Sequence, residues 1–171
     1  MESLVKGFKE NKAFRFTSRL VVGLLAITLL APVIAPYDPL SAVMKDANQA
    51  PSAAHLFGTD KLGRDVLSRI LYGASYSLTS VIALVACIFV VGTTMGIISG
   101  YFGGIVDIVI MRIADMMISF PGVILAIAMA GIMGGSLINA MIALTAVTWT
   151  KYPRLSRSLV LKIKRREFVD A

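Results

Sequence analysis

The sequence predicts an all-α fold of polytopic membrane helices, with about four spans. Three observations predict it. The 171 residues are 57% hydrophobic and only 16% charged, whereas a soluble domain is about a quarter charged. The apolar residues gather in long runs, and a run of about 20 crosses the hydrocarbon layer as a helix. The basic residues flank these runs, which is typical of membrane orientation and not of nucleic-acid binding.

Charged residues and prolines set the bounds of the N-terminal segment and of the first predicted span. Residues 1–19 form a polar, basic N-terminal segment, and residues 20–35 form the first span, which ends where Pro32 and Pro36 cannot continue a helix. Residues 36–77 form an extracytoplasmic loop. Within it, residues 60–75 predict an amphipathic helix at the membrane interface, capped by Thr59 or Asp60. That helix either contacts a partner or only anchors the next span.

Three further spans occupy residues 78–160, at about 78–99, 105–133 and 137–160. The first of them carries Gly92, Gly96 and Gly100 at intervals of four. Small residues at this spacing let another helix approach closely, so we predict a packing stripe. Pro121 predicts a kink in the span at residues 105–133.

Three charged residues, Asp107, Arg112 and Asp115, fall in or near a span. Charges buried in a membrane face protein or water and usually pair with one another. Arg112 and Asp115 are three apart and can share one helix face. These residues either belong to a translocation pathway or, as their position just after a glycine turn favours, pair structurally at the cytoplasmic interface.

The basic residues also predict the orientation. The N-terminal segment has five Lys or Arg residues and the segment from Lys151 onward has seven, whereas the four in the first loop are balanced by four Asp. Because basic residues stay on the cytoplasmic side, both ends are predicted to be cytoplasmic. An even number of spans agrees with this arrangement.

Three stretches of the sequence together resemble the permeases of the dipeptide, oligopeptide and nickel ABC importers. The first is FGTDKLGRDVLSR at residues 57–69. The second is GYFGGIVD at residues 100–107 with the later MRIAD and FP. The third contains Trp149, Tyr152, Arg154 and Arg157 and ends in REFVDA at residues 166–171.

The resemblance implies the front part of a type I importer transmembrane domain in a bacterial or archaeal inner membrane. It also implies four kinds of partner: a second homologous permease subunit, two ATP-binding subunits, an extracytoplasmic solute-binding protein and membrane lipid. Residues 161–171 are similar to the start of the family's cytoplasmic coupling loop, which in the family is followed by two further spans. The resemblance thus assigns ATPase coupling to Arg166, Glu167, Phe168, Val169, Asp170 and Ala171.

The sequence predicts no catalytic residue, cofactor or metal site. It lacks a GxxxxGK[ST] phosphate loop and has a single histidine, His55. The predicted function is therefore part of a transport pathway for di- or oligopeptides or nickel, driven by separate ATPase subunits. The alternative is a truncated or remnant membrane scaffold without transport activity. The residues do not distinguish a peptide from nickel as the substrate.

Overall fold

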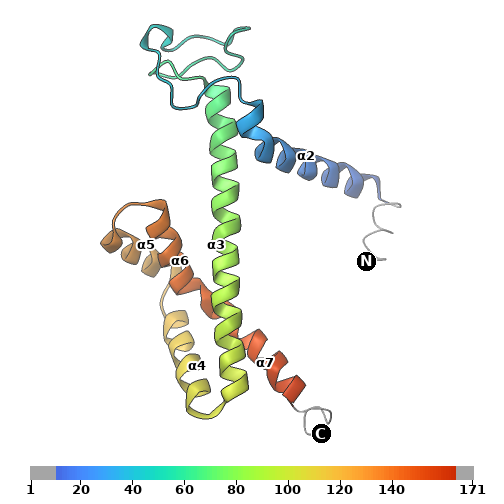
Figure 1. The fold of residues 1–171 in the computed structure, drawn as a ribbon, viewed down its shortest axis with the longest axis vertical. Coiled ribbons are helices and arrows are strands. Elements are labelled where there is room, and N and C mark those ends of the chain that lie inside the picture. The colour runs from blue at the N-terminus through green and yellow to red at the C-terminus, as the bar shows by residue number, and fades with distance from the viewer. Residues whose placement is uncertain (1–10, 165–171) are drawn as a thin grey trace. The chain divides into compact units, whose positions relative to one another are not determined.

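The computed structural model describes residues 11–164, and helices dominate it (Figure 1). The helices, with 3-10 turns written η, are α2 (Lys12–Ile34), η1 (Met44–Asp46), α3 (Val66–Phe102), α4 (Gly104–Ser119), α5 (Gly122–Met133), α6 (Leu137–Thr148), η2 (Trp149–Lys151) and α7 (Pro153–Lys164). The described residues contain no strand, only an isolated bridge between Thr59 and Asp65. The predicted all-α membrane fold is confirmed. The chain forms two compact units, Met1–Ser80 and Val81–Ala171.

Helix α2 of the first unit covers residues 20–34 of the first span predicted at 20–35. It begins before residue 20 because the Asn11 side chain accepts hydrogen bonds from the backbone N–H groups of Ala13 (3.0 Å) and Phe14 (3.3 Å) and caps it. Pro32 lies inside its last turn, and the helix ends two residues later. At 23 residues it is long and apolar enough to cross a membrane.

The predicted interface helix at residues 60–75 differs from the structure. The Asp60 carboxylate accepts hydrogen bonds from the backbone N–H groups of Leu62 (2.8 Å) and Arg64 (3.0 Å), which makes a turn. Gly63, with φ of +73°, continues that turn in a conformation that favours glycine. The helix therefore begins only at Val66, and it runs on without interruption as α3.

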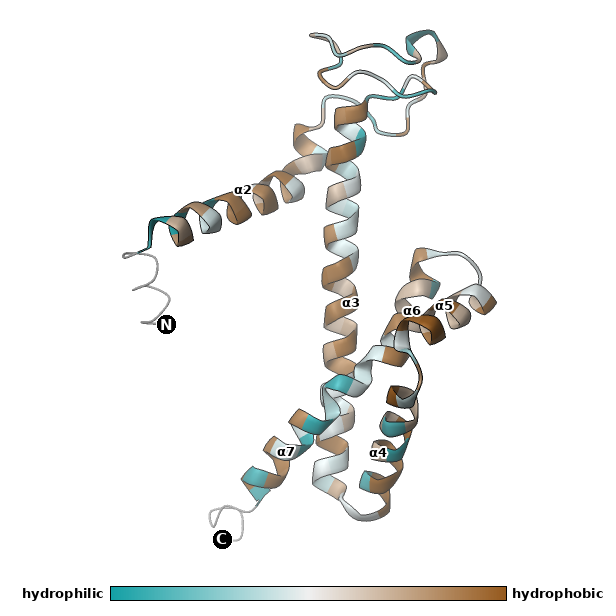
Figure 2. Cartoon of the chain, turned by 180° about the vertical axis from the view of Figure 1, so that it is seen from behind, coloured by the Kyte–Doolittle hydropathy of each residue, from teal (hydrophilic) through white to brown (hydrophobic). Residues whose placement is uncertain are grey.

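Two of the described helices, α2 and α3, are long and apolar enough to span a membrane, and their residues are mostly hydrophobic in Figure 2. The predicted span at 105–133 is instead a pair, α4 and α5, bent by 95° at the break that contains Pro121. Proline has no N–H to donate to the preceding turn, so the expected kink is a break. The pair adds a third span if it counts as one.

The predicted span at 137–160 is not one helix either. Helix α6 has 12 residues, about 18 Å of rise, which is shorter than the roughly 30 Å hydrocarbon layer. The 3-10 turn η2 follows it, and Pro153 then opens α7. The described residues therefore do not form four uninterrupted spans. Two of the apolar runs that are predicted to be continuous helices are interrupted at a proline.

Candidate functional site: three helices joined by one carboxylate

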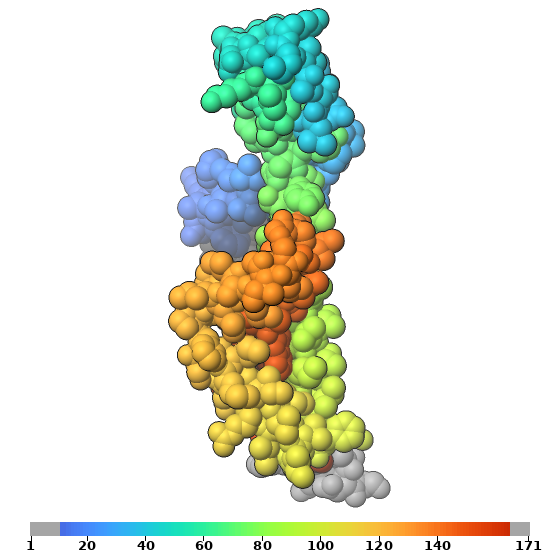
Figure 3. Space-filling model, turned by 90° about the vertical axis from the view of Figure 1, so that its left-hand side faces the viewer, coloured from blue at the N-terminus to red at the C-terminus, as the bar shows by residue number. Residues whose placement is uncertain are grey.

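The second unit brings α7 against the glycine stripe of α3. Gly92, Gly96 and Gly100 are all buried. A Cβ added to Gly96 would lie 2.5 Å from the Pro153 carbonyl oxygen, and one added to Gly100 would lie 2.9 Å from the Val160 Cβ. Figure 3 shows the dark orange and red atoms of this region between the light green of α3 and the yellow of α4. The backbones of α3 and α7 thus approach as closely as they do because no side chain separates them.

A single carboxylate joins three helices close to this stripe. Asp107 of α4 accepts hydrogen bonds from Nε (2.6 Å) and Nη2 (2.5 Å) of Arg157 on α7, and from the Ser99 hydroxyl of α3 (2.5 Å). We call Ser99, Asp107 and Arg157 the three-helix node. Ser99 is fully buried, and the fork of Arg157 fixes the carboxylate in two directions. At the end of α7, Lys164 Nζ also donates to the Tyr101 carbonyl oxygen of α3 (3.2 Å).

A second ion pair between α4 and α7 is more exposed. Arg154 Nη2 lies 2.5 Å from Asp115 Oδ1, and both side chains are more than half exposed. The expected pair of Arg112 with Asp115 is not formed, and Arg112 makes no ion pair within residues 11–164. Asp107, Arg112 and Asp115 nevertheless line one shallow hollow of about 360 Å³ together with Arg157.

The structure therefore brings the three predicted charges to one face and supplies two of them with partners from α7. Sequence reasoning missed both partners because spacing rules compare residues within one helix, whereas Asp107 and Arg157 are 50 residues apart. The predicted coupling residues, Arg166 to Ala171, lie outside the described residues. The last described residue of α7, Lys164, precedes them by two positions.

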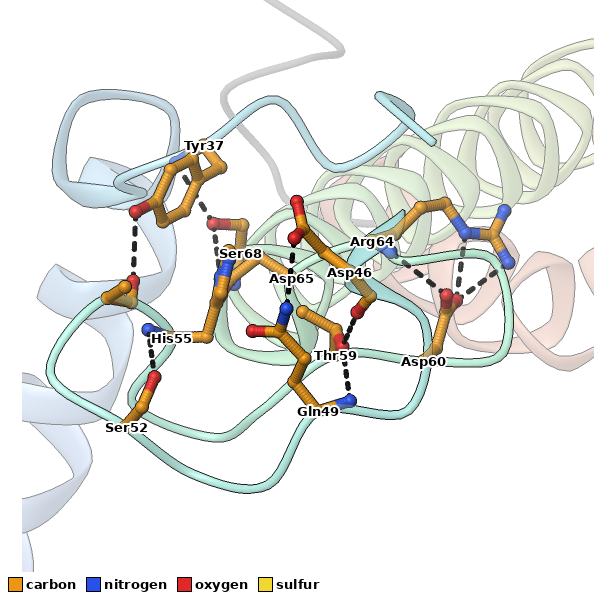
Figure 4. A network of polar contacts seen from close by, with 11 residues as sticks. Tyr37, Asp46, Gln49, Ser52, His55, Thr59, Asp60, Arg64, Asp65 and Ser68 are labelled. Atoms are coloured by element: carbon orange, nitrogen blue, oxygen red, sulfur yellow. Dashed lines mark hydrogen bonds and ion pairs between the residues drawn. The ribbon is translucent and has the colours of Figure 1, made fainter. Parts of the chain in front are cut away.

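The loop of the first unit contains a separate polar network (Figure 4). Asp65 is buried, and its carboxylate accepts from the Ser68 backbone N–H (2.8 Å), the Ser68 hydroxyl (2.8 Å) and His55 Nδ1 (2.9 Å). The Tyr37 backbone N–H donates to the Ser68 hydroxyl oxygen (3.1 Å), and the Tyr37 ring lies 4.8 Å from that of His55. Burial acts to raise the pKa of Asp65, but these hydrogen bonds outweigh it and hold the pKa below its ordinary value.

A second carboxylate in the loop holds two arginines. Besides its two backbone partners, Asp60 accepts from Arg64 Nε (2.8 Å) and pairs with Arg69. Burial alone would raise the pKa of Asp60, and the hydrogen bonds from the backbone of Arg64 and Leu62 and from the Arg64 side chain lower it well below its ordinary value. Both loop carboxylates are thus committed to holding the loop together.

In the loop network, the Ser68 hydroxyl donates to the Asp65 carboxylate (2.8 Å). Within residues 11–164, no group of three or more His, Cys, Asp or Glu side chains is arranged to hold a metal ion. The arrangement positions helices and orders a loop.

Comparison with known proteins identifies a family that the second part of this chain resembles in sequence. The family described as "Binding-protein-dependent transport system inner membrane component" matches residues 92–171, which include the glycine stripe and the three-helix node. The dipeptide transport system permease protein DppC of Alkalihalophilus pseudofirmus is 39% identical over 166 residues. That alignment covers 97% of this chain and 55% of the relative.

Two further relatives agree. DppC of Haemophilus influenzae is 38% identical over 96% of this chain and 58% of its own length. The nickel transport system permease protein NikC of Escherichia coli is 40% identical over 89% of this chain and 55% of its own length. The resemblance to the permease family is confirmed. The chain spans a little over half the length of these permeases.

Proposed function

We propose that this chain is part of the permease subunit of an ATP-binding cassette importer. It contributes helices to the pathway by which a di- or oligopeptide, or nickel, enters the cell, and separate ATP-binding subunits supply the energy. A second homologous permease and an extracytoplasmic solute-binding protein complete the assembly. The relatives support this proposal, since they are named as dipeptide and nickel transport system permeases.

The observation that carries the proposal is the way in which α7 is held. Tight backbone packing fixes one side of it to α3, and Asp107 and Asp115 of α4 bind its two arginines. A helix held in this way moves as one body with its neighbours, because packed interfaces do not deform continuously. The residues after α7 are those that resemble the coupling loop. Closure of an ATPase against Glu167 and Phe168 is therefore transmitted through α7 to α3 and α4.

The charge distribution supports the proposed orientation. Basic residues lie in α7 and in the N-terminal segment, whereas the loop balances its arginines with aspartates. We propose that the N-terminus and the segment after α7 face the cytoplasm and that the loop with Asp60 and Asp65 faces outward.

Uptake in cells tests the proposal. The gene is deleted from its host, and uptake of a labelled dipeptide and of radioactive nickel is measured separately, with and without restoration of the wild-type gene. Loss of either uptake, restored by the gene, is the expected result. Asp107→Asn should restore less uptake than Asp38→Asn, a matched change in the loop. Unchanged uptake of both compounds in the deletion strain would contradict transport by this chain and favour a scaffold.

A further inference from the structure

A groove in the second unit belongs to neither the three-helix node nor the loop. It has a volume of about 550 Å³ and lies between the α4–α5 junction and the segment α6–η2. Its apolar lining residues are Met117, Ile118, Phe120, Val123, Leu144 and Val147. The volume is within the range of small-molecule sites, roughly 300–1,000 Å³, and the walls are predominantly apolar as such sites require.

Two cations stand on the rim of the groove, and only one has a partner. Arg154 is paired with Asp115 at 2.5 Å. Lys151 is exposed, and within the part of the chain that the structure describes it makes no ion pair and no side-chain hydrogen bond. The groove therefore has a positive charge at its edge for which this chain provides no counter-ion.

The position of Lys151 in the sequence shows where that edge lies. It is the last residue of η2, which follows the largely apolar α6, and it precedes the basic helix α7. In a membrane protein, such a change from apolar to basic marks the boundary between hydrocarbon and the head groups. The groove thus joins an apolar wall at hydrocarbon depth to an uncompensated cation at head-group depth.

We infer that the groove binds one anionic phospholipid. The acyl chain lies along Phe120, Val123 and Val147, and the head-group phosphate lies at Lys151. A basic pocket between membrane helices is a recognised site for anionic head groups. A choline head group suits the site less well, because it brings a second uncompensated positive charge beside Lys151. The inference concerns binding alone and does not depend on transport.

Native mass spectrometry of the full chain in mild detergent tests the inference. The protein is offered phosphatidylglycerol and phosphatidylcholine with identical acyl chains. Wild type should retain phosphatidylglycerol about fivefold more strongly, the equivalent of one surface cation. Lys151→Gln should remove this preference, and Lys151→Arg should keep it. Lys162→Gln is the matched control, since it removes a cation from α7 outside the groove.

A second variant tests the apolar wall. Val123 lines the groove and is 71% exposed, so Val123→Trp adds bulk to the apolar wall without disturbing a core. This variant should lose retained lipid of both kinds although Lys151 remains. Equal retention of the two lipids by wild type would overturn the inference. An equal loss of the phosphatidylglycerol preference in Lys151→Gln and Lys162→Gln would also overturn it, because it would indicate general attraction of the lipid to the basic helix. Full retention of lipid by Val123→Trp would overturn it as well.

Discussion

The close contact between α3 and α7 predicts an unusual response to a small substitution, Gly96→Ala. The added Cβ would lie 2.5 Å from the Pro153 carbonyl oxygen and 2.7 Å from the Ser156 Cβ. Ordinary contact begins near 3.4 Å, so α7 has to retreat by about 0.9 Å. Neither obstacle is the end of a flexible side chain, because one is backbone and the other is a Cβ. The same retreat weakens the hydrogen bonds of the three-helix node.

The matched control is Gly73→Ala, because Gly73 lies in the same helix and a Cβ there would meet nothing within 4 Å. Alanine stabilises a helix by about 1 kcal/mol relative to glycine, and both variants have this gain. Gly96→Ala additionally overpacks a tight contact, which costs about 1–3 kcal/mol. For a chain of this size, each kcal/mol changes the melting temperature by about 2–4 °C. Gly96→Ala should therefore melt about 2–12 °C below Gly73→Ala.

The only tryptophan of the chain provides the assay. Trp149 is 9% exposed, and its carbonyl oxygen would lie 2.6 Å from a Cβ on Gly92, so its fluorescence reports this interface. Thermal unfolding in detergent, followed by tryptophan emission, should show the lower melting temperature in Gly96→Ala together with a red-shifted native emission. A Gly96→Ala protein that melts at or above Gly73→Ala with unchanged emission would refute the proposed packing.

Three other predictions concern the charges and the orientation. Asp107→Asn should lower the free energy of unfolding of the detergent-solubilised chain by about 1–3 kcal/mol, and Asp115→Asn by less than about 1 kcal/mol. The difference is expected because only the Asp107 carboxylate is held by a bidentate arginine and is largely buried. Denaturant titration measures both values, and equal losses of unfolding free energy would contradict the three-helix node. The lowered pKa of Asp65 stabilises the folded loop above the ordinary aspartate pKa of about 4, and this contribution is lost as pH falls through the lower, folded-state pKa. Limited proteolysis of the loop should therefore accelerate at acid pH, and Asp65→Asn should remove most of that pH dependence. In a Cys87→Ser background, Ser41→Cys should react with a membrane-impermeant maleimide added to intact cells; labelling only after lysis would reverse the proposed orientation.

The apolar runs predicted the helical membrane fold, but not where the helices break. Pro121 and Pro153 mark these breaks in the sequence, since proline lacks the backbone N–H donor that a continuous helix needs. Hydropathy summed over a long window conceals such a break when the flanking residues are apolar. The start of α3 shows the opposite effect: the hydrophobic periodicity from Leu62 to Leu71 predicts a helix that begins near residue 60, whereas local hydrogen bonds to Asp60 hold the chain in a turn before Val66.

The candidate site shows what periodicity can and cannot predict. Gly92, Gly96 and Gly100 repeat at a helical interval, so their common face was predictable, and the structure adds that α7 packs against it. The partner of Asp107 was not predictable from spacing. Arg157 has a signal of its own as a member of the basic run, but that run predicts orientation and does not identify a partner. Only the tertiary fold pairs residues on separate helices.

Photo-cross-linking tests the coupling proposal most directly. A photoreactive amino acid is placed at Phe168, in the predicted coupling segment, or at Phe57, in the loop, and the full chain is irradiated in its native membrane. The account predicts that Phe168 forms a cross-link to an ATP-binding subunit and that Phe57 does not. A cross-link to an ATP-binding subunit from Phe57, or none from Phe168 in membranes that contain such subunits, would contradict it.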